Sequence, residues 1–295
     1  MTTISLYTAI HLTSHTKESI FPFSYQHPAI SKGIDFLKTK MDENGCIISV
    51  SVTAWAAIAI ASSGDDLSKW EKTRQYLIDS VGLLNSSIAT DYERHCLALV
   101  SFGENPRNVN GKDLVNTIKD FYINGQIGFE NNSYDDIFGI IALRSCGVSS
   151  DDEIIQHCIL HILKGQYPNG GWGDVDTTAA AIISLTAYDS FDTHPQVQKA
   201  ISFLRNQQTN TGGFFSWGTS NSASTSWALC SIVSAQENPT DIAWKKNNCS
   251  PVDFLLMLQQ SDGSFLYSEN TTMNPEWMTA YVIIALTGGT FGSRI

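Results

Sequence analysis

Six segments of the chain share one pattern and recur at intervals of about 40 to 55 residues. Each is rich in small and apolar residues and opens near a Ser, Thr or Asp; they start at Ser51, Thr90, Tyr134, Val175, Ser224 and Glu276. When their last apolar residues are aligned, six residues fall into one column, namely Thr53, Tyr92, Asp136, Thr178, Thr225 and Thr279. Intervals of this length are typical of repeats made of two helices. The repeat therefore restricts the chain to architectures built from helix pairs.

The repeated segments are apolar on nearly every side, which is typical of helices that are buried all round. The stretches between them carry apolar residues three or four positions apart, the spacing of amphipathic helices; these stretches are 30–38, 72–81, 112–122, 153–163, 197–205 and 252–258. The pattern predicts an all-α protein, an (α/α)6 barrel or toroid of six helix hairpins, with the repeated segments as its inner ring. We expect no strands of alternating polarity.

The linkers from outer to inner helices combine glutamine, glycine and aromatic residues, as in GQYPNGGWG, NQQTNTGGFFSWG and LQQSDGSF. Glycine permits tight backbone turns, and an aromatic side chain can fill the gap between neighbouring helix pairs. These linkers resemble the QW repeats of squalene cyclases and the related repeats of protein prenyltransferase β subunits. The resemblance covers residues from about 28 to 287 and implies a toroid with an aromatic-lined cavity open at one end. We expect an N-terminal extension over 1–27 and a single toroid domain over 28–295.

The stretch DVDTTA, from Asp174 to Ala179, resembles the DxDTT signature of class II terpene cyclases. The resemblance implies that Asp176 protonates an alkene or epoxide, with Asp174 and Thr178 in support. Such an acid must hold its proton, whereas a free aspartic acid titrates near about pH 3.9; burial in an apolar cavity raises a carboxyl pKa. The same residue types also cap helices, because their oxygens accept the unpaired amide protons of a first turn. A general acid and a helix cap both fit the motif.

Aromatic side chains on the repeated segments are candidates for the walls of the implied cavity, since ring faces stabilise a carbocation by cation–π attraction. The substrate-binding candidates are Trp55, Tyr92, Tyr134, Phe138, Trp227, Trp277 and Tyr281, with Asp136 at the rim. Ordinary core packing would explain most of the aromatic residues equally well.

Asp135 and Asp136 form a second acidic pair at an equivalent rim position. They would bind Mg²⁺ if the substrate carried a diphosphate, or they would cap the helix. Only Arg94 and Arg144 lie on the repeated segments to neutralise a diphosphate, so an uncharged isoprenoid or a metal-bridged phosphate is easier to accommodate. Prenyltransferases bind zinc through a DxC motif and a later His. The stretch DVDTTA contains no cysteine and no histidine follows His194, so we expect no protein-bound zinc.

The net charge of −11 argues against nucleic acid as a partner, because binding to phosphates needs clustered cations. No stretch approaches the roughly 18 apolar residues of a membrane span, and the six cysteines are dispersed without a CxxC pair. We expect a soluble, cytoplasmic protein.

Two classes of function fit these features. The first is a class II-like terpene cyclase, an isomerase that starts the cyclisation of a linear isoprenoid by protonation. The second is a non-catalytic toroid that binds a ligand or a partner, as in cobalamin carriers and prenyltransferase-repeat proteins. Some bacterial cyclases join one such toroid to a second domain, so a second catalytic protein or domain is also an expected partner.

Overall fold

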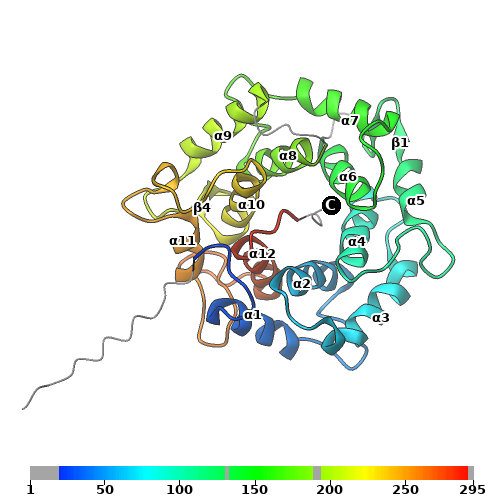
Figure 1. Ribbon diagram of the computed structural model, residues 1–295, viewed down its shortest axis with the longest axis horizontal. Helices are drawn as coiled ribbons and strands as arrows, with labels where there is room; N and C mark the ends of the chain where they lie inside the picture. Colours follow the sequence, from blue (N-terminus) through cyan, green and yellow to red (C-terminus); the bar gives the residue numbers. More distant parts are fainter. Residues whose placement is uncertain (1–19, 130–132, 189–193, 292–295) are drawn as a thin grey trace, which may run out of the picture.

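The computed structural model describes residues 20–291, except 130–132 and 189–193. In this part of the chain, inner and outer helices alternate along the sequence and form two concentric rings (Figure 1). The inner helices are α2 (Val50–Ser63), α4 (Ala89–Ser101), α6 (Ser133–Ser145), α8 (Val175–Tyr188), α10 (Ser222–Ser234) and α12 (Pro275–Leu286). The outer helices are α1 (Pro28–Thr39), α3 (Glu71–Asp79), α5 (Leu114–Asp120), α7 (Glu153–Lys164), α9 (Pro195–Gln207) and α11 (Pro251–Met257). The prediction of an all-α toroid of helix hairpins is confirmed.

The two rings differ in burial as their sequence patterns predict. Most side chains of α2, α8 and α10 are buried, because each inner helix packs against two inner neighbours and an outer helix. The outer helix α7 instead buries one face, which contains Ile155, Cys158, Ile159 and Ile162. Helix α12 packs against α2, and this contact closes the inner ring.

The aligned column of rim residues has a shared structural task. Five of its six members each accept a hydrogen bond from a backbone N–H of the preceding linker, at 2.8 to 3.0 Å between nitrogen and oxygen. The pairs are Thr53 with Ile47, Asp136 with Ile127, Thr178 with Trp172, Thr225 with Phe214, and Thr279 with Phe265. Tyr92 differs, since its ring packs against Phe121. The column therefore fastens each linker to the inner helix that follows it.

The linker glutamines join each hairpin to the next. The amide of Gln166 donates to the carbonyl oxygen of Gln196, that of Gln208 to Trp244, and that of Gln259 to Ala29. The last of these bonds connects the linker after α11 to α1 and closes the outer ring across the two ends of the chain. The glycine of this linker, Gly263, has φ of 92°, and a Cβ there would lie 2.2 Å from the Lys32 carbonyl oxygen. Only glycine allows so close an approach.

The linkers contain short strands in addition to the helices that the sequence predicts. Two antiparallel hairpins contain β1 (Tyr122–Ile123) with β2 (Gln126–Ile127), and β3 (Phe215–Ser216) with β4 (Thr219–Ser220). They lie within linkers, where a tight turn brings two residues on each side into register, and they leave the helical architecture unchanged. The short 3-10 helices are η1 (Leu67–Trp70), η2 (Ser80–Leu83) and η4 (Ile242–Trp244).

Part of the predicted N-terminal extension packs against the toroid. The backbone N–H of Phe23 donates to Leu286 of α12, and that of Tyr25 donates to Ser63 of α2. Residues 20–27 thus bridge the two helices that close the inner ring, whereas residues 1–19 lie outside the described chain. Among the described helices, none is long and apolar enough to cross a membrane.

Candidate active site

A cavity of about 300 Å³ opens among the N-terminal halves of α6, α8, α10 and α12. We call it the aromatic cavity; it is lined by Tyr134, Phe138, Asp176, Ala180, Ala223, Trp227, Asn274, Trp277, Met278 and Tyr281. Six of these are residues that the sequence singled out, and they come from four different repeats. They meet because equivalent positions of successive inner helices face the same axis. Among the described residues of the lining, Asp176 is the only acidic side chain and none is basic.

Asp176 lies in the first turn of α8 and is partly buried. Its Oδ2 accepts a hydrogen bond of 2.8 Å from the indole Nε1 of Trp217, and its Oδ1 has no hydrogen-bond partner. Burial raises the pKa of Asp176 above its ordinary value, whereas the nearby Ser224 hydroxyl and Trp217 indole favour the ionised form and oppose the rise. The net effect is a carboxyl group that keeps its proton to higher pH than a free aspartic acid.

Trp217 was not among the residues that the sequence indicated. It forms the turn between β3 and β4 with Gly218, and the φ values of the two residues are 55° and 90°. Two successive positive φ angles are what a type I′ hairpin turn requires, although a bulky residue rarely adopts one. The turn places an indole that is 71% exposed beside Asp176. The only sequence signal for this position was the aromatic linker FFSWG itself.

Asp174 and Thr178 have structural partners. The Oδ1 of Asp174 accepts the backbone N–H of Thr177 at 2.8 Å, so Asp174 caps α8. The hydroxyl of Thr178 accepts from Trp172 and donates to the Asp174 carbonyl, and its side chain is fully buried. The negative charge of Asp174 contributes to the raised pKa of Asp176. Thr177, which the sequence did not single out, donates from its hydroxyl to the Tyr134 hydroxyl at 2.7 Å.

The rings of the aromatic cavity meet edge to face. The interplanar angle is 86° between Phe138 and Trp227, 81° between Trp227 and Tyr281, and 89° between Trp277 and Tyr281. Burial raises the pKa of Tyr281, so its hydroxyl stays neutral. This arrangement gathers several neutral, electron-rich rings around one cavity, and such rings stabilise a carbocation.

Three predicted binding residues do not line this cavity. Trp55 is buried beside it and packs edge-on against Trp227 and Tyr281. Tyr92 packs against Phe121 on the other side of the ring. Asp136 is fully buried, where its Oδ1 accepts the backbone N–H of Ile127.

The second acidic pair, predicted either to bind magnesium or to cap a helix, is hydrogen-bonded to the preceding loop. Both carboxylates hold one loop, since Asp135 accepts from the backbone of Phe129 and Asp136 from that of Ile127. In the described chain, no group of three or more His, Cys, Asp or Glu side chains is arranged to hold a metal ion. The two candidate arginines are also engaged, Arg94 with Asp91 and Arg144 with the carbonyls of Val148 and Ala187.

Comparisons with known proteins identify the architecture. Residues 174–285 match the family described as the squalene-hopene cyclase C-terminal domain. The type II terpene cyclase MstE from Scytonema is 14% identical, with a TM-score of 0.65 over 88% of this chain and 96% of that one. The chain shares the toroid fold of this type II terpene cyclase. The ent-copalyl diphosphate synthase from Streptomyces platensis is 17% identical, with a TM-score of 0.61 over 82% of this chain and 51% of that one.

The same toroid also occurs in a protein of different chemistry. An α-1,6-mannanase from Salegentibacter is 11% identical, with a TM-score of 0.66 over 88% of this chain and 98% of that one. A comparison with curated proteins gives no similar sequence. The function of this toroid must therefore be argued from its site, because a shared fold does not fix chemistry.

Proposed function

We propose that the chain is a class II-like terpene cyclase in which Asp176 protonates a linear isoprenoid. The carboxyl gives its proton to one carbon of a terminal alkene, and the π electrons of the next double bond attack the resulting cation and form a ring bond. The last cation loses a proton to water, and Asp176 regains its own from water. The reaction is an isomerisation and needs no further reactant.

The observation that carries this proposal is the placement of one carboxyl with a raised pKa in an aromatic cavity. Among the described residues of the lining, Asp176 is the single acidic one, and burial raises its pKa. A general acid is more effective when its pKa is raised towards the working pH. The aromatic walls supply cation–π stabilisation at about 0.5 to 2 kcal/mol per ring.

The lining also favours one class of substrate. Apart from Asp176 and Asn274, its walls are apolar or aromatic, and the described residues among them include no basic side chain, so the space suits the uncharged part of an isoprenoid. The MstE cyclase of the same fold has been solved with geranylgeranyl dihydroxybenzoate as substrate and with merosterolic acid A as product. These structures support the view that a toroid of this size can enclose a prenyl chain.

Replacement of the acid tests the proposal. The protein is incubated with squalene, farnesyl diphosphate or geranylgeranyl diphosphate, and products are analysed by gas chromatography–mass spectrometry. We expect a cyclised product from the wild type and a loss of at least about 100-fold with Asp176→Asn, since general acids contribute about 10²- to 10⁴-fold. Asp113→Asn makes the same change at the cap of α5 and should leave the rate unchanged. Binding without any cyclised product would instead favour the non-catalytic toroid.

The pH dependence provides a second test. Because the acid must be protonated, the cyclisation rate should fall as the pH rises through the raised pKa of Asp176. Trp217→Phe removes a hydrogen bond that favours the ionised form, so the fall should move to higher pH. Trp70→Phe removes an equivalent bond of 2.9 Å to Asp65, outside the cavity, and should not move the profile. A rate profile unchanged by Trp217→Phe would mean that Asp176 is not the group that titrates.

A further inference from the structure

The chain returns into the toroid after its last helix. Beyond α12, residues 288–291 run towards the axis of the inner ring, and the described chain ends there (Figure 1). The backbone N–H of Gly289 donates to the Ile284 carbonyl and turns the chain inward. Phe291, the last described residue, is only 1% exposed. Phe291 is therefore buried inside the inner ring, against side chains of the inner helices.

Phe291 is surrounded by the aromatic residues of the inner ring. It stacks on Trp227, with 3.8 Å between ring centroids and 20° between planes. It meets Trp55 and Tyr281 edge to face, at centroid distances of 5.5 and 5.1 Å. Trp227 and Tyr281 are also walls of the aromatic cavity. Phe291 therefore contacts two residues that also line the cavity containing Asp176.

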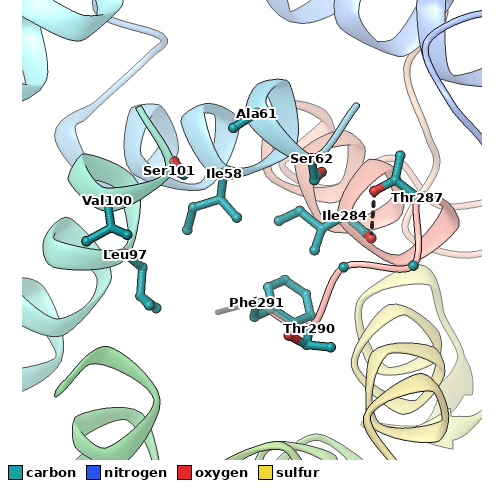
Figure 2. A pocket seen from close by; sticks show the side chains of 12 residues that line it. Ile58, Ala61, Ser62, Leu97, Val100, Ser101, Ile284, Thr287, Thr290 and Phe291 are labelled. Atoms are coloured by element: carbon teal, nitrogen blue, oxygen red, sulfur yellow. Dashed lines mark hydrogen bonds between the residues drawn. The ribbon is translucent and has the colours of Figure 1, made fainter. Parts of the chain in front are cut away.

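A second cavity lies on the other side of Phe291. We call it the tail cavity; it has a volume of about 370 Å³ among the C-terminal halves of α2, α4 and α12. Figure 2 shows Phe291 reaching into the space between Ile58, Leu97 and Ile284. The walls combine aliphatic side chains with the hydroxyl groups of serine and threonine, and among the described residues no charged side chain lines them. The two cavities together have more than twice the volume of the aromatic cavity alone.

We propose that Phe291 is a specificity-determining residue, which forms with Trp227 a floor between the aromatic cavity and the tail cavity and limits the length of the isoprenoid that binds above it. This inference rests on the proposed function for its substrate class. A linear isoprenoid with its reactive end at Asp176 extends along the lumen axis, and the stacked pair of Phe291 and Trp227 blocks that axis. Trp227 lines the aromatic cavity and Phe291 lines the tail cavity, so removal of the Phe291 ring would thin this floor to the Trp227 ring and leave more room for a longer isoprenoid.

A binding series without turnover tests the floor. Farnesol and geranylgeraniol, which differ by one isoprene unit, are titrated into the Asp176→Asn protein, and binding is followed by quenching of tryptophan fluorescence. We expect Phe291→Ala in this background to raise the affinity for geranylgeraniol relative to farnesol by about tenfold or more, as expected when a pocket gains room for additional methylenes. Phe291→Trp should shift the ratio the other way.

Two further variants test whether Phe291 limits the length of the ligand or only packs in the core. Phe36→Ala removes a buried ring on the outer helix α1, outside the lumen, and should leave the ratio unchanged. Phe291→Leu retains an apolar side chain and should shift the ratio in the same direction as Phe291→Ala, which covers the case that the alanine variant does not fold. An unchanged ratio in a folded Phe291 variant, or no binding of either alcohol, overturns the proposal. If the ratio shifts as expected but the wild type makes no cyclised product, the floor stands and the catalytic proposal fails.

Discussion

Glu93 on α4 is fully buried, and neither of its carboxyl oxygens has a hydrogen-bond partner. Burial, followed by the negative charges of Asp135 and Asp136, raises its pKa well above the ordinary value. Below about pH 4 the folded and unfolded chains both hold this proton. Above that pH the unfolded chain ionises while the folded chain stays protonated, so the free energy of unfolding falls as pH rises.

Because the free energy of unfolding falls as pH rises, an apolar replacement of Glu93 of similar size should stabilise the protein most at high pH. Glu93→Met should raise the free energy of unfolding at pH 7 by on the order of 1 to 3 kcal/mol, because it removes a buried polar group without a partner. The gain should be smaller at pH 4, and urea denaturation at both pH values measures it. Glu269→Met changes an exposed side chain and should have little effect at either pH. A less stable Glu93→Met protein at both pH values would show that the carboxyl has a favourable partner.

At the scale of the elements, the rim column explains how a linker is set against its inner helix. The hydroxyl of Thr225 is fully buried and accepts the backbone N–H of Phe214 at 3.0 Å. This N–H lies in the linker that continues into the β3–β4 hairpin, which in turn places Trp217 beside Asp176. A change at the column therefore acts on the site through the linker.

Thr225→Val should lower the free energy of unfolding by about 1 to 3 kcal/mol, since the buried N–H of Phe214 would lose its acceptor. Thr39→Val is the matched control, because its hydroxyl only donates to the Phe36 carbonyl at the end of α1. Thermal and urea denaturation compare the two. Equal losses in both variants would contradict a fastening role for the column.

For the whole molecule, closure of the ring is the feature that distinguishes the chain from an open array of repeats. An open array has terminal repeats that contact one neighbour only. Here α12 packs on α2, and the Gln259 amide bonds to Ala29 and Gly263 as the Gln208 amide bonds to Trp244 and Gly212. The junction between the chain ends thus has the same bonds as an internal junction.

Gln259→Ala and Gln208→Ala should therefore destabilise the protein by similar amounts, about 1 to 3 kcal/mol each. Far-ultraviolet circular dichroism and tryptophan fluorescence should report one coincident unfolding transition in urea for both variants. A much smaller loss for Gln259→Ala, or a separate early transition, would mean that the ring opens at its ends before it unfolds.

The helix-pair repeat, the two classes of helix and the rim column could all be predicted from the sequence, because periodic burial and local capping act over a few residues. The same reasoning brought Tyr134, Phe138 and Asp176 into one cavity, since equivalent positions of a closed ring face its axis. It also placed Tyr92 and Asp136 at the rim, where their side chains instead pack on Phe121 and bond to Ile127. A column alignment gives the level of a residue on its helix but not the direction of its side chain.

Only the tertiary structure decided which distant residues complete the site. Trp217 reaches Asp176 through a turn in a linker, and Phe291 reaches Trp227 because the chain after α12 turns into the lumen. Neither contact has a periodic signal, since each depends on the path of one loop over a ring that must close first. The repeat determined by itself that a lumen exists, and the packing of the closed ring determined how it is divided.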